Sequence, residues 1–293
     1  MTYTPQVTPV TSRDNPLIKE LRKLCLDGTA YRKTGRIWIE GEHLFSAYTQ
    51  RGLKAAIAVF SDSFYQNKLL NTPLALTEYA QAAIKLIVIP DAFMAELSGL
   101  DSVAGMGLVC DITNFKLGNE SDESQQFNDT RHPLDQIDPA APTVILDRLQ
   151  DPGNVGSILR SAAAFGFTQI IALKGSAALY APKVLRAGMG AHFGLKLIES
   201  AEPESLKTLQ LPLATTSSHQ GHFLHEMLQN KELLAQYPKG FSWVLGHEGQ
   251  GVSAALQAMA QLHVRIAQPG GEESLNVAAA AAVCLHASAT MRL

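Results

Sequence analysis

The sequence predicts a two-domain α/β protein in which a domain built on a parallel sheet follows a small mixed α/β domain. From residue 142 onward, short apolar strands alternate with helices, which is typical of a parallel sheet covered on both faces. Residues 116–141 are rich in polar residues and proline and have too few apolar side chains to offset their ordering entropy. We therefore expect a small mixed α/β domain over 1–115, a mobile linker over 116–141 and a second domain over 142–293.

The first domain is predicted to begin with an amphipathic helix between residues 11 and 27. Its apolar side chains recur at roughly helical spacing, Pro16 stands in the first turn, and Ser12 or Asp14 could cap the helix. Alternating side chains then predict a strand at 36–41. The remaining predictions for this domain are helices at 42–50, 77–85 and 92–98, and strands at 55–60, 74–77 and 106–111.

Charge is unevenly distributed along the chain. The formal net charge is −3, which alone does not suggest a nucleic-acid partner. Seven basic residues nevertheless gather near the N-terminus: Arg13, Lys19, Arg22, Lys23, Arg32, Lys33 and Arg36. A solvated helix face is the common meaning of such a cluster, and RNA contact is the less common one.

The second domain is predicted to repeat a strand–helix unit. Strands are expected at 143–146, 169–173, 195–198, 213–216, 243–245 and 263–266, and helices after Gly153, Pro182, Pro203, Gly221, Val252 and Ser274. In open parallel sheets, ligands bind at the carboxyl ends of the strands.

Several classes of protein are disfavoured. Cys25, Cys110 and Cys284 form no Cys-x-x-Cys pair, and the histidines at 219, 222 and 225 lack a His-Glu-x-x-His core, so we expect no metal. The chain also lacks the Walker loop, the dinucleotide glycine fingerprint and the serine-hydrolase elbow. Neither a membrane-spanning stretch nor a signal peptide is evident, and we expect a cytoplasmic protein.

Three polar loops follow predicted strands of the second domain. The first runs from Asp151-Pro152-Gly153-Asn154 to Arg160, the second covers 246–251 as Gly-His-Glu-Gly-Gln-Gly, and the third covers 269–277 before an alanine run. Taken singly, each has an ordinary interpretation as a capped helix, a glycine-rich turn or a helix cap.

Together, the three loops resemble the three motifs of the SpoU branch of the SPOUT RNA methyltransferases, the TrmH-like enzymes. Asp151 to Gly156 with Arg160 is similar to the first motif, 245–251 to the second, and Pro269-Gly270-Gly271 with Ser274-Leu275-Asn276-Val277 to the third. Scattered positions near the N-terminus, including Ile39-Glu40-Gly41, are similar to the L30e-like substrate-binding domain of many members.

The resemblance implies an S-adenosylmethionine-dependent enzyme that methylates a ribose 2′-hydroxyl in rRNA or, less expectedly, tRNA. It also implies a C-terminal α/β domain with a deep trefoil knot, and active sites formed at a homodimer interface. Arg160 becomes the candidate for orienting the ribose and stabilising the developing alkoxide, because a guanidinium is a poor base. Asn154, Glu248, Ser274 and Asn276 become the candidates for positioning it through hydrogen bonds.

By their positions in the motifs, six residues are candidates for binding the cofactor: Leu245, Gly246, Gly251, Ile266, Gln268 and Leu275. The chain departs from the family where Ile266-Ala267-Gln268 replaces the common Ile-Pro-Met. Two other functions stay open from the sequence. One is a non-catalytic RNA-binding protein on the same fold, and the other is a Rossmann oxidoreductase, which the missing glycine fingerprint disfavours.

Overall fold

The structure is a computed structural model that describes residues 5–98, 102–115, 136–270 and 274–291. Contacts between these residues divide them into two compact units. The first unit contains 5–98, 102–115 and 180–193, and the second contains 136–179, 194–270 and 274–291. The larger part of the predicted linker, 116–135, lies outside the described residues, as does Gly271.

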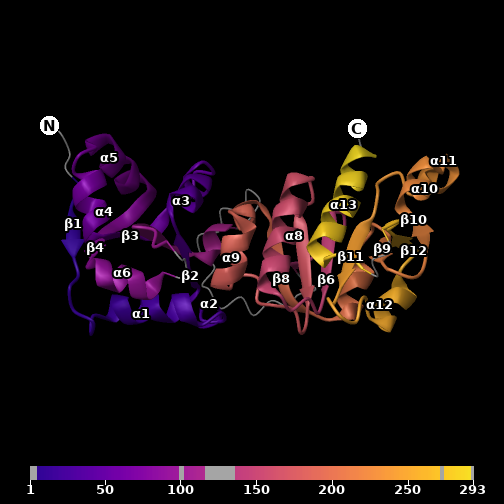
Figure 1. Cartoon of the computed structure of the whole chain (residues 1–293), viewed down its shortest axis with the longest axis horizontal. Coiled ribbons are helices and arrows are strands. Elements are labelled where there is room, and N and C mark those ends of the chain that lie inside the picture. The colour runs from indigo at the N-terminus through magenta and orange to yellow at the C-terminus, as the bar shows by residue number, and fades with distance from the viewer. Residues whose placement is uncertain (1–4, 99–101, 116–135, 271–273, 292–293) are drawn as a thin grey trace. The chain divides into compact units, whose positions relative to one another are not determined.

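The first unit is built on a mixed five-stranded sheet in the order β1-β4-β3-β5-β2 (Figure 1). β3 pairs in parallel with β4 and antiparallel with β5, which in turn pairs antiparallel with β2. The strands are β1 (Val7–Pro9), β2 (Arg36–Glu40), β3 (Ala55–Ser61), β4 (Ala83–Ile89) and β5 (Met106–Asp111). The mixed α/β character predicted for the N-terminal part is therefore confirmed.

Helices and single turns accompany these strands in the first unit. The α-helices are α1 (Pro16–Leu26), α2 (Tyr31–Thr34), α3 (Glu42–Thr49), α4 (Asp62–Phe64), α5 (Pro73–Ala82), α6 (Asp91–Leu97) and α9 (Pro182–Gly188). A π-helical turn covers Tyr65–Leu69, and 3-10 turns cover Ile112–Phe115 and Ala191–Gly194.

Three predictions for this unit are wrong. Residues 74–77 belong to α5 and are not a strand, because Pro73 opens a run of strong helix formers. The helix predicted to reach residue 85 ends at Ala82, and the β-branched run that follows forms β4. The cap of α1 is Asn15, whose side chain accepts a hydrogen bond of 2.9 Å from the Leu17 amide.

The N-terminal basic cluster is largely ion-paired. Arg13 and Arg22 both contact Glu96, at 2.5 and 2.7 Å. Arg36 contacts Asp111 at 2.9 Å and Glu20 at 3.3 Å. These pairs favour the solvated, charge-balanced surface over a free cationic patch at those arginines.

Residues 180–193 belong to the first unit although they lie between two strands of the second. The Tyr180 ring contacts the rings of Tyr31 and Phe115, with centroids 5.3 and 6.2 Å apart. Phe193 lies 5.2 Å from Tyr48 and 5.3 Å from Phe115. These aromatic contacts fix α9 and the turn after it within the first unit.

The second unit is built on a seven-stranded sheet in the order β10-β12-β9-β11-β6-β7-β8, and every pairing is parallel. Its strands are β6 (Thr143–Asp147), β7 (Gln169–Leu173), β8 (Lys196–Ala201), β9 (Leu213–Thr216), β10 (His222–Phe223), β11 (Ser242–Gly246) and β12 (Leu262–Arg265). The parallel sheet is confirmed, with the short edge strand β10 in addition to the six predicted strands.

The helices of the second unit are α8 (Pro152–Ala164), α10 (Leu224–Gln229), α11 (Lys231–Ala235), α12 (Ala254–Met259) and α13 (Val277–Thr290). The helix predicted after Pro203 is a 3-10 helix over Pro203–Thr208.

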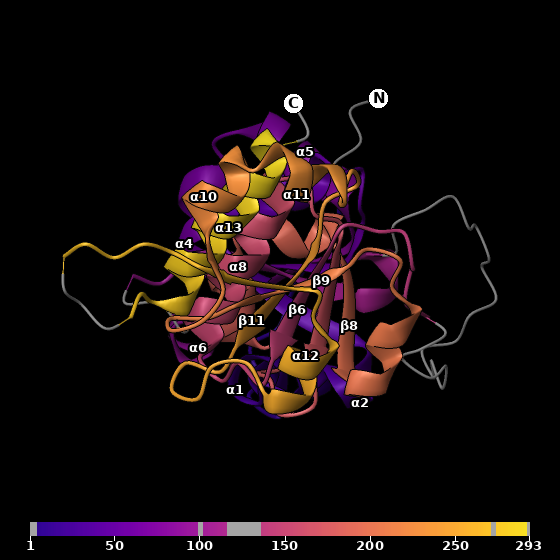
Figure 2. The ribbon, with the colours of Figure 1, turned by 90° about the vertical axis from the view of Figure 1, so that its right-hand side faces the viewer.

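The two faces of this sheet bury different side chains. Val244 of β11 lies in a core cluster with Leu256 of α12, and Ile137 belongs to the same cluster. The neighbouring Trp243 donates a hydrogen bond of 2.7 Å from Nε1 to Ser288 of α13. Since successive side chains of a strand point to opposite faces, α12 and α13 cover opposite faces. α8 packs beside α13 (Figures 1 and 2).

Within the described ranges, no helix combines the length and the apolar character needed to span a bilayer. The three cysteines are free, with Cys110 and Cys284 buried and Cys25 partly buried.

Candidate active site

The three predicted loops leave the same edge of the second sheet. β6 ends at Asp147, β11 at Gly246 and β12 at Arg265. Because these strands are all parallel, their carboxyl ends lie at one edge, where ligands of such sheets bind. The loops lead from there toward the first turns of α8 and α13.

The loop after β11 is closed by its own backbone. The His247 amide donates to the Gly251 carbonyl at 3.1 Å, and the Gly251 amide donates to the His247 carbonyl at 2.8 Å. A Cβ on Gly246 would lie 2.1 Å from the Val252 nitrogen, so only glycine fits there. Gly251 has a φ of 68°, in the left-handed region that favours glycine.

This closed loop carries Glu248 to the first turn of α8. One carboxylate oxygen of Glu248 accepts from the Asp151 amide at 3.1 Å and from Asn154 Nδ2 at 3.3 Å. The other oxygen accepts from the Gln150 amide at 3.3 Å. Asp151 is itself the N-cap of α8 and accepts from the Asn154 amide at 2.7 Å. An anion at a helix N-terminus is also favoured by the helix dipole.

Asn154 also links the first turn of α8 to the third loop. Its Oδ1 accepts a hydrogen bond of 2.9 Å from Nδ2 of Asn276. Oδ1 of Asn276 accepts from the amides of Ala278 and Ala279, at 2.9 and 3.3 Å, and so caps α13. The direction of each bond is fixed, because the Glu248 carboxylate can only accept and each amide must then donate toward it. We call Glu248, Asn154 and Asn276 the polar relay.

The relay keeps Glu248 ionised. Partial desolvation acts to raise the pKa of this carboxyl, but the backbone amides and the Asn154 side chain that donate to it outweigh that effect, and the pKa is lowered. Glu248 is therefore a weak base at neutral pH.

Arg160 and Ser274 are not drawn into the relay. Arg160 lies in the middle of α8 with an exposed side chain, and Ser274 is exposed just before the α13 cap. Neither side chain makes a hydrogen bond or ion pair with another residue of the described ranges. As far as the described residues are concerned, their donors are therefore available to an incoming molecule.

The six candidate cofactor residues differ in what they can present. The Leu245 side chain is fully buried, so this residue can offer only its backbone to a ligand. Gly246 and Gly251 belong to the closed loop, and Leu275 is 43% exposed. Ile266 and Gln268 are partly buried in the loop after β12, and the Gln268 Oε1 is buried without a donor among the described residues.

Asp147 is a polar residue of this edge that the sequence prediction missed. It is only 1% exposed, and its carboxylate accepts from the Ser253 amide at 2.6 Å and from Arg148 Nε at 3.0 Å. It thereby ties the end of β6 to the residue before α12. The sequence feature that could have identified Asp147 is a carboxylate directly after an apolar predicted strand.

Arg148 extends the same connection. Its φ of 59° is unusual for a residue other than glycine and marks local backbone strain. Its guanidinium also donates to Gln250 of the closed loop at 3.3 Å.

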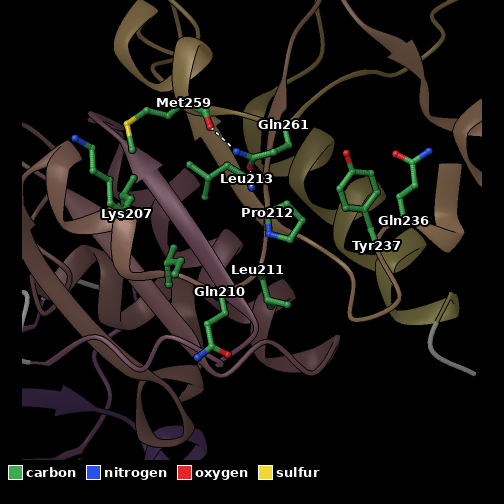
Figure 3. A pocket seen from close by; sticks show the side chains of 11 residues that line it. Lys207, Gln210, Leu211, Pro212, Leu213, Gln236, Tyr237, Met259 and Gln261 are labelled. Carbon is green, nitrogen blue, oxygen red and sulfur yellow. Dashed lines mark hydrogen bonds between the residues drawn. The ribbon is translucent and has the colours of Figure 1, made fainter.

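A separate hollow of about 520 Å³ lies at the opposite end of the strands (Figure 3). Its lining includes Leu213 at the start of β9, Gln261 just before β12, and Lys207, Tyr237 and Met259. None of the predicted site residues lines it, so we do not assign it to the candidate active site.

Among the described residues, no cluster of three or more His, Cys, Asp or Glu side chains could hold a metal ion. His219 donates its amide to the Ser217 hydroxyl, and the His225 ring packs 5.5 Å from that of Phe223.

Comparison with known proteins decides the family. The profile of the SpoU rRNA methylase family matches residues 141–286, which contain all three loops. An uncharacterized tRNA/rRNA methyltransferase of Synechocystis is 31% identical over 97% of this chain and 94% of its own length. The chain belongs to the SpoU rRNA methylase family.

Other SpoU relatives have named activities. A 23S rRNA (guanosine-2′-O)-methyltransferase of Bacillus subtilis is 30% identical over 59% of this chain and 68% of its own length. Among solved structures, an RNA 2′-O-ribose methyltransferase aligns with a TM-score of 0.70 and 26% identity over 97% of this chain and 99% of its own. The AdoMet-bound rRNA methyltransferase of Sinorhizobium meliloti shares the fold, with a TM-score of 0.74 and 22% identity over 98% and 99% of the two chains. The predicted fold class is thus confirmed over nearly the whole chain of this protein.

Proposed function

We propose that this SpoU-family chain is an S-adenosylmethionine-dependent methyltransferase acting on a ribose 2′-hydroxyl of rRNA. The polar relay carries the proposal, because it joins one residue from each of the three loops into a single frame, and the helix α8 that carries Asn154 also carries Arg160, which makes no hydrogen bond or ion pair within the described residues. tRNA is the less favoured substrate.

The residues of the edge fit such a cofactor. The backbone at Gly251 and Gly270 is open: apart from the adjoining residues of the chain, no described residue has an atom within 4 Å of where a Cβ would stand, so a ligand can approach the main chain. The buried Oε1 of Gln268 has no donor among the described residues, and the cofactor carries amino groups that could supply one. We assign the main chain of Leu245 and Gly246, together with Ile266, Gln268 and Leu275, to the wall of this site.

The cofactor supplies an electrophilic methyl group on a sulfonium sulfur. The ribose O2′ must reach it in line, and negative charge grows on that oxygen as its proton leaves. The exposed Arg160 guanidinium can donate to O2′ and to an adjoining phosphate at once, which orients the ribose and stabilises the charge. In this proposal Ser274, which is exposed, hydrogen-bonds to the same nucleotide.

Glu248 has a positioning role in this proposal. Its lowered pKa and its three partners make it unsuited to accept the hydroxyl proton. The relay instead holds the closed loop, α8 and α13 in one arrangement, from which α8 presents Arg160.

We further propose that the enzyme works as a homodimer and that its C-terminal domain forms a deep trefoil knot, as the family resemblance implies. An apolar hollow of about 440 Å³ between α10 and α13 supports an interface there, since Val283 in its lining is 43% exposed. Light scattering of the wild-type protein and of Val283→Glu tests the dimer.

The decisive test of the function is nucleoside mass spectrometry. Purified enzyme with S-adenosylmethionine and unmodified rRNA transcripts is expected to form a 2′-O-methylnucleoside, and tRNA transcripts serve as the comparison. Binding of the cofactor without methylation of either RNA would favour a non-catalytic RNA-binding protein.

A further inference from the structure

At one end of the second sheet, Arg265 is stacked on an aromatic ring. Arg265 ends β12 and is the direct partner of Phe223 on the neighbouring strand β10. Its guanidinium carbon lies 3.7 Å from the centre of the Phe223 ring, well within the range of a cation–π contact. The His225 ring packs 5.5 Å from the Phe223 ring.

The backbone holds this pair in place. Gly221 has a φ of 98°, and a Cβ there would lie 2.1 Å from the carbonyl oxygen of His263. The chain before β10 therefore passes directly against β12, and this close approach positions Phe223 beside Arg265.

The positive charge of Arg265 is not neutralised by any residue in the described ranges. Its Nε is buried and donates to none of them, and its side chain forms no ion pair with them. The residue as a whole is partly exposed, which leaves the two terminal nitrogens as donors open to solvent. A guanidinium whose plane is fixed on a ring presents its donors in the fork that matches an oxyanion.

The location connects this pair with the candidate active site. β12 is two strands away from β11 in the sheet order, so the ends of these strands lie on the order of 10 Å apart. Both ends are at the carboxyl edge that carries the relay. Arg265 directly precedes Ile266 of the proposed cofactor wall.

We propose that Arg265, held on Phe223, binds a backbone phosphate of the RNA substrate next to the nucleotide that is methylated. The inference rests on the proposed function. A cofactor bound at this edge would bring a second anion, its carboxylate, which the experiment distinguishes from an RNA phosphate. A phosphate contact positions the strand without reading its sequence.

Salt dependence of RNA binding provides the test. Arg265→Met keeps an apolar side chain against Phe223 but removes the charge. Affinity for a short fluorescent single-stranded RNA of mixed sequence should fall about tenfold at low salt, and the slope of log affinity against log salt should become shallower by about 0.7, as expected for one phosphate contact. Lys207→Met is the matched control, because Lys207 lies at the opposite end of the strands, and it should change neither quantity.

Two further variants separate the charge from the stack. Arg265→Lys and Phe223→Leu both keep the positive charge, so the salt slope should stay at the wild-type value while affinity falls a few-fold through loss of the fixed plane. Light scattering and thermal unfolding of each variant exclude a change in assembly or folding as the cause.

Calorimetry with S-adenosylhomocysteine tests the other anion. Cofactor-product affinity should be the same for wild type and Arg265→Met. An unchanged salt slope would overturn the inference, since Arg265 would then be neutralised within the chain. A loss of product affinity with normal RNA binding would overturn it in favour of the cofactor carboxylate. If the wild-type enzyme methylates rRNA but either of these two results is obtained, the inference fails and the proposed function stands. If the wild-type enzyme does not methylate rRNA, the proposed function itself fails.

Discussion

The relay and Arg160 share the helix α8 but differ in what surrounds them. Asn154 in the first turn is bonded to Glu248 on one side and Asn276 on the other. Arg160, further along the same helix, is exposed and contacts no partner in the described part of the chain. The difference separates two tasks: the relay sets the positions of three loops, and Arg160 is left to meet the substrate.

The largest expected effect separates these tasks at Arg160. Arg160→Ala should reduce methyl transfer by about 10²–10³-fold, as does loss of a donor to a developing oxyanion. Because the side chain is exposed and makes no hydrogen bond or ion pair with the described residues, the free energy of unfolding should change by less than about 0.5 kcal/mol. Transfer rates under single-turnover conditions and urea unfolding check both. Activity above a tenth of wild type would remove Arg160 from its assigned role, and Arg160→Lys shows whether charge alone suffices.

Glu248→Gln is expected to have the next largest effect. In contrast to Arg160→Ala, this substitution should lower the stability of the fold. A glutamine keeps the shape but cannot accept all three hydrogen bonds, and its own amide would face donors. We expect stability to fall by about 1 kcal/mol, together with weaker cofactor binding. Urea unfolding and calorimetry with S-adenosylmethionine measure the two. Glu226→Gln, on the exposed surface of α10, is the matched control and should leave both quantities unchanged.

Variants of Asn276 separate the two roles of its side chain, which caps α13 through Oδ1 and donates a hydrogen bond to Asn154 through Nδ2. Asn276→Ala loses both the α13 cap and the bond to Asn154 and should cost about 1 kcal/mol. Asn276→Asp keeps a good capping oxygen but cannot donate to Asn154, so it should retain most of the stability and lose part of the activity. If Asn276→Asp is as active in methyl transfer as the wild-type protein, the hydrogen bond from Asn276 to Asn154 is dispensable.

The smallest expected effect is a dependence on pH. The pKa of Glu248 is lowered in the folded state, so its stabilisation is fully present above its unfolded pKa and is lost as pH falls through the folded value. The stability difference between wild type and Glu248→Gln should therefore shrink as the pH is lowered past 4.5, the ordinary pKa of this carboxyl, toward its lowered pKa in the folded state. Urea midpoints measured across this range check it, and a constant difference would contradict the relay as the source of the shift.

Strand and helix patterns in the second unit were readable from the sequence because they are local. Each of its six predicted strands exists, and Asn276 caps α13 as its position before the alanine run suggests. β10 is only two residues long and carries no periodic signal. The placement of α9 in the first unit depends on Tyr180 meeting Tyr31 and Phe115, which are contacts across more than 60 residues.

The candidate site was predicted in membership but not in arrangement. The motif resemblance pointed to Asn154, Glu248 and Asn276, yet nothing local shows that they bond in that order. Asp147 was missed because an acidic residue after a strand has many possible roles until its burial is known. The cytoplasmic location and the domain boundaries stay predictions.

Cofactor affinity measured side by side for Arg160→Ala and Glu248→Gln tests the separation of tasks most directly. Calorimetry should give Arg160→Ala the dissociation constant of wild type for S-adenosylmethionine, despite its loss of methyl transfer, and should give Glu248→Gln a weaker one. Weaker cofactor binding by Arg160→Ala, together with unchanged cofactor binding by Glu248→Gln, would contradict the division between the polar relay, which positions the loops, and Arg160, which meets the substrate.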